Sequence, residues 1–429
     1  MSPNMMLLAL CCRKAWRWQL RGILPVSWQG LCGPAGVGET MIKLVFWASV
    51  VLILYHHVGY PLVVRAIAAW IGRKSHEPVS EPAVPPSVTI IVPAHNEEAV
   101  IAAKIRNLAA LEYPRDRLTV VLPLDGCTDG TAAIARGLLG EIGSLDLRIV
   151  EYPSNIGKIA VLNDQIGRAH SDIVALSDTS SLLDPQALSQ AVRHFKRPSV
   201  GVVCPTYALI RPGSEGERAY WNYQTRVKAA EGAVGAPMGA HGAFYLFRRN
   251  LWEPLEPDTI NDDFVLPMRI VRRGYDAVYD IGIVATELET STARQDFRRR
   301  IRIGAGNLQQ VLRLPDLADP RRPGLAFTFL SGKALRAFMP FLLLIAAVSL
   351  PVLAVREGGF YLYALTGEVL VGLAALVGHL GVPGMIPRPV RWAAYFVQGH
   401  AAGFIGALIL LGGLQGHAWK LSAAAKAKA

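Results

Sequence analysis

The fold is decided by a β-branched run that ends in a polar turn, VTIIVPAHNEE at residues 88–98. Residues 88–92 predict a buried strand, and a helix is expected from about Glu97 to Leu111, with Asn96 able to cap it. The same order recurs downstream, with strands expected at 118–124, 147–150 and 173–176 and helices at 131–139 and from about Lys158. Near-continuous apolar strands that alternate with helices predict a mainly parallel sheet covered on both faces. Residues 88–320 are therefore expected to form one α/β domain.

Acidic side chains stand where the expected strands end. Asp125 follows one apolar run, Asp178 follows another, and the pair Asp262 and Asp263 comes later in the chain. Ligands of open α/β sheets collect outside the carboxyl ends of the strands. Carboxylates at that edge suit a metal-bridged diphosphate and a proton that has to be removed. The pattern therefore predicts the active site of a transferase.

The chain is too apolar for a purely soluble protein. Of its 429 residues 52% are hydrophobic and 18% charged, and the mean hydropathy is +0.29. A membrane helix is expected within residues 41–74, before the α/β domain, and about three more within 337–416, at 337–354, 360–380 and 392–414. Each approaches or reaches the ~20 residues that a bilayer helix needs. A buried core is the less favoured explanation of these runs. Residues 75–87 are rich in proline and predict a linker, and 321–336 an interfacial segment.

Charge predicts the orientation of these helices. Basic residues near Arg65, Lys333 and Arg336 place the α/β domain in the cytosol, as part of a multi-pass protein of the inner (cytoplasmic) membrane. A net charge of +11 is then more typical of contact with anionic membrane lipid than with nucleic acid, because no nucleic-acid module is recognisable. Strict alternation of the spans puts the basic tail, 417–429, outside. Either one segment does not span the membrane or the tail is tolerated there.

The amino-terminal segment and the cysteines carry little functional signal. Residues 1–40 place their basic residues after a short apolar run, the reverse of a signal peptide, and Met41 opens a more typical beginning. We therefore expect 1–40 to be a non-native or disordered extension. The five cysteines form no CxxC pair, so neither structural zinc nor a disulfide framework is expected.

Several motifs in the α/β region resemble one known family. PAHNEE at 93–98, DGCTDGT at 125–131 and NIGK at 155–158 look like the inverting glycosyltransferases of family 2, and most like their cellulose-synthase-like membrane branch. The resemblance covers roughly residues 88–310 and continues through Asp178, Asp262-Asp263 and the arginines near 300. It implies a GT-A fold with transmembrane helices on both sides of the domain in sequence.

The resemblance implies a nucleotide-sugar donor, with a UDP-sugar favoured. Ala94, Glu97 and Asp125 would line the pocket for the base and ribose, and Lys158 would reach the nucleotide or its phosphates. For Glu97 and Asp125, purely structural roles are the alternatives. A carboxylate in a first helical turn is stabilised by the helix dipole, and Asp-Gly sequences form tight turns.

The family's metal motif is altered here. Asp178 occupies the first position of the DxD motif, whose carboxylates hold Mg²⁺ or Mn²⁺ against the donor diphosphate. Ser180 occupies the third position, so one carboxylate is lost. A purely structural Asp178, which caps the turn before Asp184, is the alternative.

The resemblance also implies residues for the acceptor and the leaving group. Asp263, beside Asp262, would be the general base, although both could equally begin a helix. Gly239 and His241 would shape the acceptor pocket, or His241 would only pack. Arg299 and Arg302 stand near the QxxRW position and would bind the diphosphate, or face lipid. The tryptophan of that motif is replaced by Ile303, which weakens the case for processive synthesis.

The leading hypothesis is a membrane-bound inverting glycosyltransferase that acts on a lipid, a lipid-linked sugar or a growing polysaccharide. The alternative is a catalytically inactive scaffold or binding subunit of an exopolysaccharide assembly complex, suggested by Ser180 and the altered QxxRW position. A nucleotidyltransferase is a weaker rival, because the glycine-rich phosphate loop expected near its first strand is missing from the sequence.

Overall fold

The computed structural model describes residues 37–72, 84–210, 215–288, 293–380 and 386–414. The expectations for nearly all of residues 1–40, for most of the linker 75–87 and for the tail 417–429 fall outside these described residues. The chain divides into two compact units, one within residues 1–51 and 343–368 and the other within 52–342 and 369–429.

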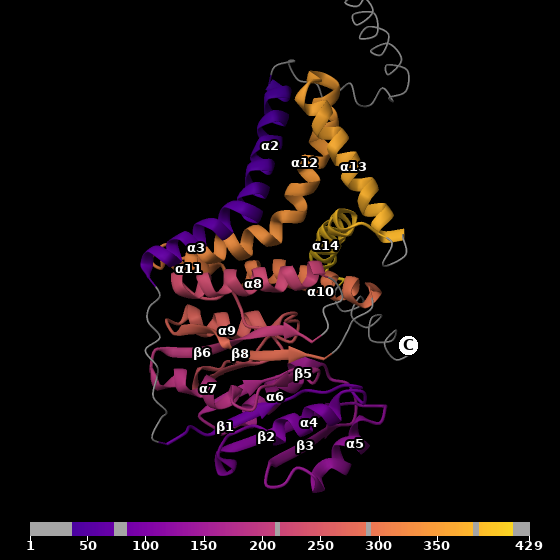
Figure 1. The fold of residues 1–429 in the computed structure, drawn as a ribbon. Helices are drawn as coiled ribbons and strands as arrows, with labels where there is room; N and C mark the ends of the chain where they lie inside the picture. The colour runs from indigo at the N-terminus through magenta and orange to yellow at the C-terminus, as the bar shows by residue number, and fades with distance from the viewer. Residues whose placement is uncertain (1–36, 73–83, 211–214, 289–292, 381–385, 415–429) are drawn as a thin grey trace, which may run out of the picture. The chain divides into compact units, whose positions relative to one another are not determined.

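The larger unit is built on an eight-stranded sheet with the order β3-β2-β1-β4-β7-β6-β8-β5 (Figure 1). The strands are β1 (Val88–Ile91), β2 (Leu118–Asp125), β3 (Asp146–Tyr152), β4 (Ile173–Leu176), β5 (Ser181–Leu183), β6 (Val200–Leu209), β7 (Tyr245–Arg248) and β8 (Asp276–Glu287). Strands β1 to β4 pair in parallel with one another, and β6 pairs in parallel with β8. Strand β7 runs antiparallel to both β4 and β6, and β5 runs antiparallel to β8. The predicted, mainly parallel α/β sheet is confirmed.

Helices cover both faces of this sheet. They are α4 (Ile101–Ala109), α5 (Thr131–Gly137), α6 (Lys158–Arg168), α7 (Ala187–Arg193), α8 (Glu215–Val234), α9 (Asp262–Arg272) and α10 (Ala293–Arg313). Adjacent residues of β1 show the two layers, because Ile90 belongs to the core with α4 and α7 while Ile91 belongs to the core with α6 and α9. Side chains of a strand alternate between the faces, so a β-branched run fills both cores.

The first helix begins later than the sequence predicts. The backbone of Asn96 is left-handed, with φ 55°, and its side-chain oxygen accepts a hydrogen bond from the backbone N–H of Thr128 at 2.8 Å. Helix α4 therefore starts at Ile101 and not at Glu97. The expected capping role of Asn96 is wrong, because its side chain ties two loops together.

Helices long and apolar enough to cross a membrane flank the domain in sequence. The four candidate spans are Gly38–Ile71, Pro323–Glu357, Phe360–Leu380 and Arg388–Leu411. The first contains α2 (Val37–Leu54) and α3 (Tyr60–Ile71), joined by a π-helical turn, and the second contains α11 (Pro323–Phe327), a π-helical segment (Thr328–Ala334) and α12 (Leu335–Glu357). Residues 321–336, where an interfacial segment is expected, thus begin the second candidate span. The others are α13 (Phe360–Leu380) and α14 (Arg388–Leu411).

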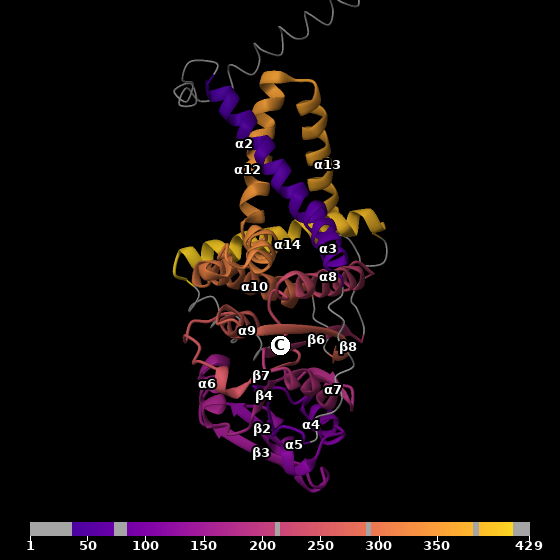
Figure 2. The same ribbon diagram turned by 90° about the vertical axis from the view of Figure 1, so that its left-hand side faces the viewer.

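Two of these helices are tied to the sheet-bearing unit. Tyr60 of α3 donates a hydrogen bond from its hydroxyl to the buried carboxylate of Glu231 at 2.8 Å. Helix α14 packs closely on α10, as Figure 2 shows, since a Cβ atom added to Gly304 would lie 2.7 Å from the Cα atom of Gly403. The guanidinium of Arg300 lies over the ring of Tyr395, 4.1 Å from its centroid. The apolar helix α14 therefore contacts α10, the helix that carries the arginines, whereas α3 contacts α8.

The turn after β2 generates a prediction about stability. Gly126 has φ 60°, and a Cβ atom there would lie 2.3 Å from the backbone nitrogen of Asn155. We expect Gly126→Ala to lower the free energy of unfolding by about 1–3 kcal/mol, because it adds backbone strain and displaces the loop before α6. Gly137→Ala is the matched control, since Gly137 has φ −62° in α5 and open space around it, and it should stabilise by about 0.4–1 kcal/mol. Thermal unfolding in detergent measures both, and equal effects would contradict the strain argument.

Candidate active site

Three distant parts of the chain meet at the ammonium group of Lys158. Lys158 begins α6, Asp178 follows β4, and Asp262 begins α9. The Nζ of Lys158 lies 3.1 Å from Oδ1 of Asp178 and 3.3 Å from Oδ1 of Asp262. The structure therefore brings together the predicted phosphate-binding lysine, the predicted metal ligand and the first residue of the predicted catalytic pair.

Lys158 and Asp178 stay accessible while they interact, with side chains 41% and 40% exposed. Burial lowers the pKa of the Lys158 ammonium, but the carboxylates of Asp178 and Asp262 outweigh it and raise the pKa. Burial likewise raises the pKa of Asp178, and the positive charge of Lys158 reverses that shift, so the pKa of Asp178 lies below its ordinary value. Both groups are charged at neutral pH and open to a ligand.

Asp125 shapes the loop that leads to Lys158. Its side chain is 4% exposed, and its two carboxylate oxygens accept hydrogen bonds from the backbone N–H groups of Ile156 at 2.7 Å and Gly157 at 3.0 Å. Its own N–H donates to the carbonyl oxygen of Ala94 at 2.8 Å. Asp125 thus has a structural role that the sequence did not reveal, and its contact with a base or ribose stays a prediction.

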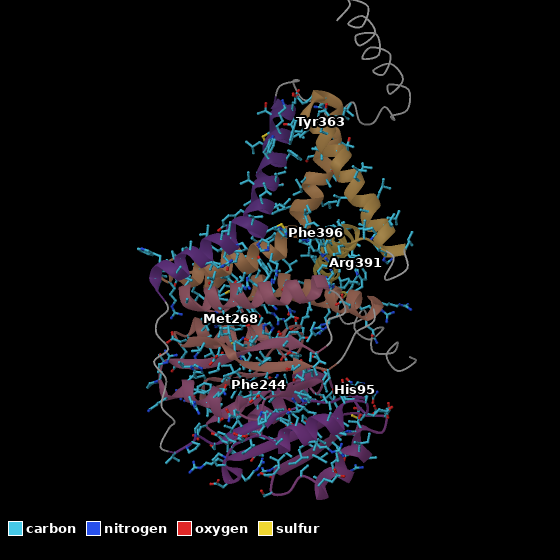
Figure 3. The ribbon with its side chains drawn as sticks, in the orientation of Figure 1. His95, Phe244, Met268, Tyr363, Arg391 and Phe396 are labelled. Carbon is cyan, nitrogen blue, oxygen red and sulfur yellow. The ribbon has the colours of Figure 1, made fainter. Side chains whose placement is uncertain are left out.

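The first two motifs hold each other in place. The backbone N–H of Glu97 donates to the hydroxyl of Thr131 at 2.8 Å, and the carboxylate of Glu98 accepts from the N–H of Gly130 at 2.8 Å. His95, which Figure 3 labels, places its Nδ1 atom 2.5 Å from the carbonyl oxygen of Asp125. The loops at the ends of β1 and β2 therefore form one connected rim, which contains Ala94 and Glu97.

Asp178 stands on a turn that contacts the expected acceptor segment. Its N–H donates to the carbonyl oxygen of Gly242 at 3.2 Å. A Cβ atom on Gly242 would lie 2.9 Å from Oδ2 of Asp178, so a glycine there leaves room for the carboxylate. Ser180, in the third position of the motif, accepts a hydrogen bond at its carbonyl oxygen from the N–H of Leu288 at 2.9 Å.

The carboxylates of Asp262 and Asp263 differ in their surroundings. Asp262 is 6% exposed, and its buried Oδ2 atom has no hydrogen-bond partner among the described residues. Burial and the charge of Asp262 raise the pKa of Asp263, although Lys158 and Lys333 oppose the shift. The carbonyl oxygen of Asp263 accepts from the N–H of Ala240 at 2.8 Å. Both residues do begin a helix, α9, which holds their side chains at the site.

The two predicted acceptor-binding residues, Gly239 and His241, pack against aromatic rings. Gly239, with φ 80°, packs on the ring of Phe264, and the His241 ring stacks on that of Tyr207 with centroids 5.6 Å apart. Burial and the charge of Lys228 hold the pKa of His241 well below its ordinary value, so the ring is neutral.

Arg299 and Arg302, the two predicted diphosphate-binding residues on α10, interact with different parts of the site. Burial raises the pKa of Asp178, and the charge of Arg299 helps to lower it, after the larger effects of Lys158 and Lys104. Arg302 donates to the carbonyl oxygen of Ile260 at 3.5 Å and so touches the segment before α9. Arg299 is therefore the better placed of the two to act near Asp178.

Two buried groups at the site were missed by sequence reasoning. The hydroxyl of Tyr245 is buried without a hydrogen-bond partner in the described part of the chain, and burial with the charges of Asp262 and Asp263 raises its pKa well above the ordinary value. Lys104 is 0% exposed beneath the Asp178 turn, and burial lowers its pKa to about 7. Tyr245 carried no signal in the sequence. Lys104 did, because it falls on the apolar stripe of its helix.

Residues 85–306 match the model of the family described as glycosyltransferase like family 2. The chain belongs to this family. A family 2 relative, the beta-monoglucosyldiacylglycerol synthase of Trichormus variabilis, is 27% identical over 315 residues, which are 70% of this chain and 67% of the relative. The poly-beta-1,6-N-acetyl-D-glucosamine synthase of Staphylococcus aureus is 24% identical over 234 residues, 53% of this chain and 56% of that one.

A solved structure is similar over most of the chain. The mannosyltransferase PcManGT from Pyrobaculum calidifontis, in complex with GDP-Man and Mn²⁺, has a TM-score of 0.66 and 26% identity, covering 86% of this chain and 99% of that one. The family 2 match and this likeness confirm the GT-A fold and show that the protein is a glycosyltransferase.

The residues present fit a divalent cation. Asp178 and Asp262 offer carboxylate oxygens to one positive charge, and the unpartnered Oδ2 of Asp262 is a further oxygen at the same place. Hard cations such as Mg²⁺ and Mn²⁺ prefer oxygen ligands and often take several from substrate phosphates. No cluster of three or more His, Cys, Asp or Glu side chains suited to a metal occurs among the described residues, so Asp178 and Asp262 would supply only part of the coordination of a bound cation.

The central contact generates a prediction about nucleotide binding. Lys158→Met should weaken the binding of UDP or GDP, with Mn²⁺ present, by about 10- to 100-fold, because the carboxylates of Asp178 and Asp262 would repel a diphosphate without it. The matched control is Arg168→Met, which removes one positive charge from the exposed end of the same helix. Calorimetric titration of both variants tests this, and equal affinities would refute the role of Lys158.

Proposed function

We propose that this chain is a membrane-bound inverting glycosyltransferase that transfers a sugar from a nucleotide-sugar donor to a lipid-linked or polysaccharide acceptor. The observation that carries the proposal is the convergence of Lys158, Asp178 and Asp262 with Asp263 beside them. In this arrangement the groups that would bind a diphosphate lie next to Asp263, a carboxylate of raised pKa, which supports the proposal. A catalytically inactive scaffold has no need of that combination.

The donor is a nucleoside diphosphate sugar. The similar mannosyltransferase structure contains GDP-Man, whereas the family resemblance of the motifs favours a UDP-sugar. We favour a UDP-sugar and make a GDP-sugar the alternative to be tested. The diphosphate would lie against Lys158 and Arg299, with Arg302 nearby, and the base against the rim that contains Ala94.

Inversion needs one displacement at the anomeric carbon. Asp263 would accept the proton of the acceptor hydroxyl while that oxygen attacks the donor sugar from the side opposite the diphosphate, whose bond to the sugar breaks. Lys158 and Arg299 would stabilise the negative charge that the nucleoside diphosphate gains on leaving. Mg²⁺ or Mn²⁺, held by Asp178 and Asp262, would supply further neutralisation of that charge.

The acceptor would bind beside Asp263, against the segment of Gly239 and His241. The N–H of Ala240, which lies between those two residues, donates to the backbone carbonyl oxygen of Asp263, so this segment lies next to the residue that carries the proposed base. The relatives are named for a diacylglycerol product and for a polysaccharide product, and four helices of this chain are apolar enough to cross a membrane. An acceptor at the membrane, with the catalytic domain on the cytosolic side of the inner membrane, agrees with both.

The base assignment generates the decisive prediction. Asp263→Asn should reduce kcat by roughly 10²–10⁴-fold and leave the affinity for UDP or GDP nearly unchanged, because only the proton transfer is lost. Radiolabelled transfer from a panel of nucleotide sugars to native membrane lipids, with Mn²⁺ or Mg²⁺ supplied, measures the rate. Asp116→Asn is the matched control, since that side chain is 81% exposed and precedes the amino end of β2, whereas the site lies at the carboxyl ends of the strands. Turnover near that of the wild type in Asp263→Asn would remove Asp263 as the base.

A further inference from the structure

A lysine occupies a core position in α4. The helix packs on the sheet through Ile101, Ile105 and Leu108, each at most 1% exposed. Lys104 lies on the same stripe, three residues after Ile101, and its side chain is 0% exposed. Burying an ammonium group costs folding free energy unless hydrogen bonds satisfy its N–H groups and its positive charge interacts favourably with nearby groups. Such a residue calls for an explanation beyond packing.

The partners of Lys104 flank Asp178 on both sides. Its Nζ donates to the hydroxyl of Ser177 at 2.7 Å and to the carbonyl oxygen of Ser181 at 2.6 Å, and the hydroxyl of Ser181 lies 3.5 Å away. All three acceptors are neutral oxygens, and no carboxylate of the described residues pairs with this lysine. The ammonium is therefore bound to the two ends of the turn that presents Asp178.

The protonation of each group decides which one donates and which one accepts in these hydrogen bonds. In its charged form the Lys104 amine only donates, so the hydroxyl of Ser177 then accepts from it and gives its own proton to the carbonyl oxygen of Ala243, 2.7 Å away. The hydroxyl of Ser181 reaches the same carbonyl oxygen at 2.6 Å. Ala243 follows Gly242, whose carbonyl oxygen accepts from the N–H of Asp178. Lys104 thus connects the Asp178 turn to the segment 239–243.

We propose that Lys104 is a positioning residue for the donor diphosphate, holding the Asp178 turn in the orientation that lets its single carboxylate serve the site. This rests on the proposed function. The need for such a residue arises because Ser180 replaces the second carboxylate of the motif, so that the direction of the remaining one matters more. Lys158 does not supply this constraint, because it contacts Asp178 at an accessible surface, where an arriving ligand competes for it.

The test compares two α4 variants. Lys104→Met removes the ammonium but keeps most of the side-chain volume. Asn107→Ala is the matched control, because Asn107 links the same helix to β5 by two hydrogen bonds with Leu183, at 2.7 and 2.8 Å, away from Asp178. Both should lower the melting temperature. Only Lys104→Met should raise the Kd for UDP or GDP with Mn²⁺, by about tenfold or more, and raise the donor KM while leaving the acceptor KM unchanged.

Hydrogen exchange provides a readout that does not depend on nucleotide. Lys104→Met should speed amide exchange in peptides that cover residues 177–181 and 239–243, and Asn107→Ala should leave the second of these unchanged. If Lys104→Met fails to fold, Ser181→Ala removes one hydroxyl of the network and should act in the same direction with a smaller size. Unchanged exchange and an unchanged Kd in the folded variant would make Lys104 a core residue only. A wild-type protein that binds neither nucleotide would contradict the proposed function, while the exchange experiment would still decide the role of Lys104.

Discussion

The ammonium of Lys158 between the carboxylates of Asp178 and Asp262 is the contact on which the site depends. It joins the start of α6, the end of β4 and the start of α9, which are far apart in the chain. Without a cation, two carboxylates at that distance would repel each other and any diphosphate that approached. With it, that repulsion is partly offset, and we propose that the accessible ammonium of Lys158 exchanges one of these contacts for a phosphate oxygen.

The backbone around this contact has little freedom. Asp125 binds the two amide groups just before Lys158, and Gly126 allows the loop of Asn155 to pass close to the end of β2. On the other side, Gly242 leaves room for the carboxylate of Asp178, and Lys104 holds the turn from below. The motif residues are therefore of two kinds. Some would face the ligand, and others keep the loops in place so that the first kind can converge.

The strands β1 to β4 could be predicted because their apolar runs are short, β-branched and bounded by turn residues, as residues 88–92 illustrate, whereas no strand was predicted for β5 to β8. The site residues on strand ends could be predicted for the same reason, since parallel strands deliver Asp125 and Asp178 to one edge. The start of α4 could not, because the left-handed backbone of Asn96 depends on a partner in a distant loop. The antiparallel pairing of β7 and the buried hydroxyl of Tyr245 likewise depend on neighbours that are remote in sequence.

A structure of the detergent-solubilised protein with UDP or GDP and Mn²⁺ would show whether a diphosphate binds at Lys158. We expect density for the diphosphate and the ion beside Asp178 and Asp262, with the Nζ atom of Lys158 turned to a phosphate oxygen and the carboxylate of Asp263 facing the donor sugar's position. A nucleotide bound away from the carboxyl ends of β1 and β4, with the contact between Lys158, Asp178 and Asp262 left undisturbed, would contradict this expectation.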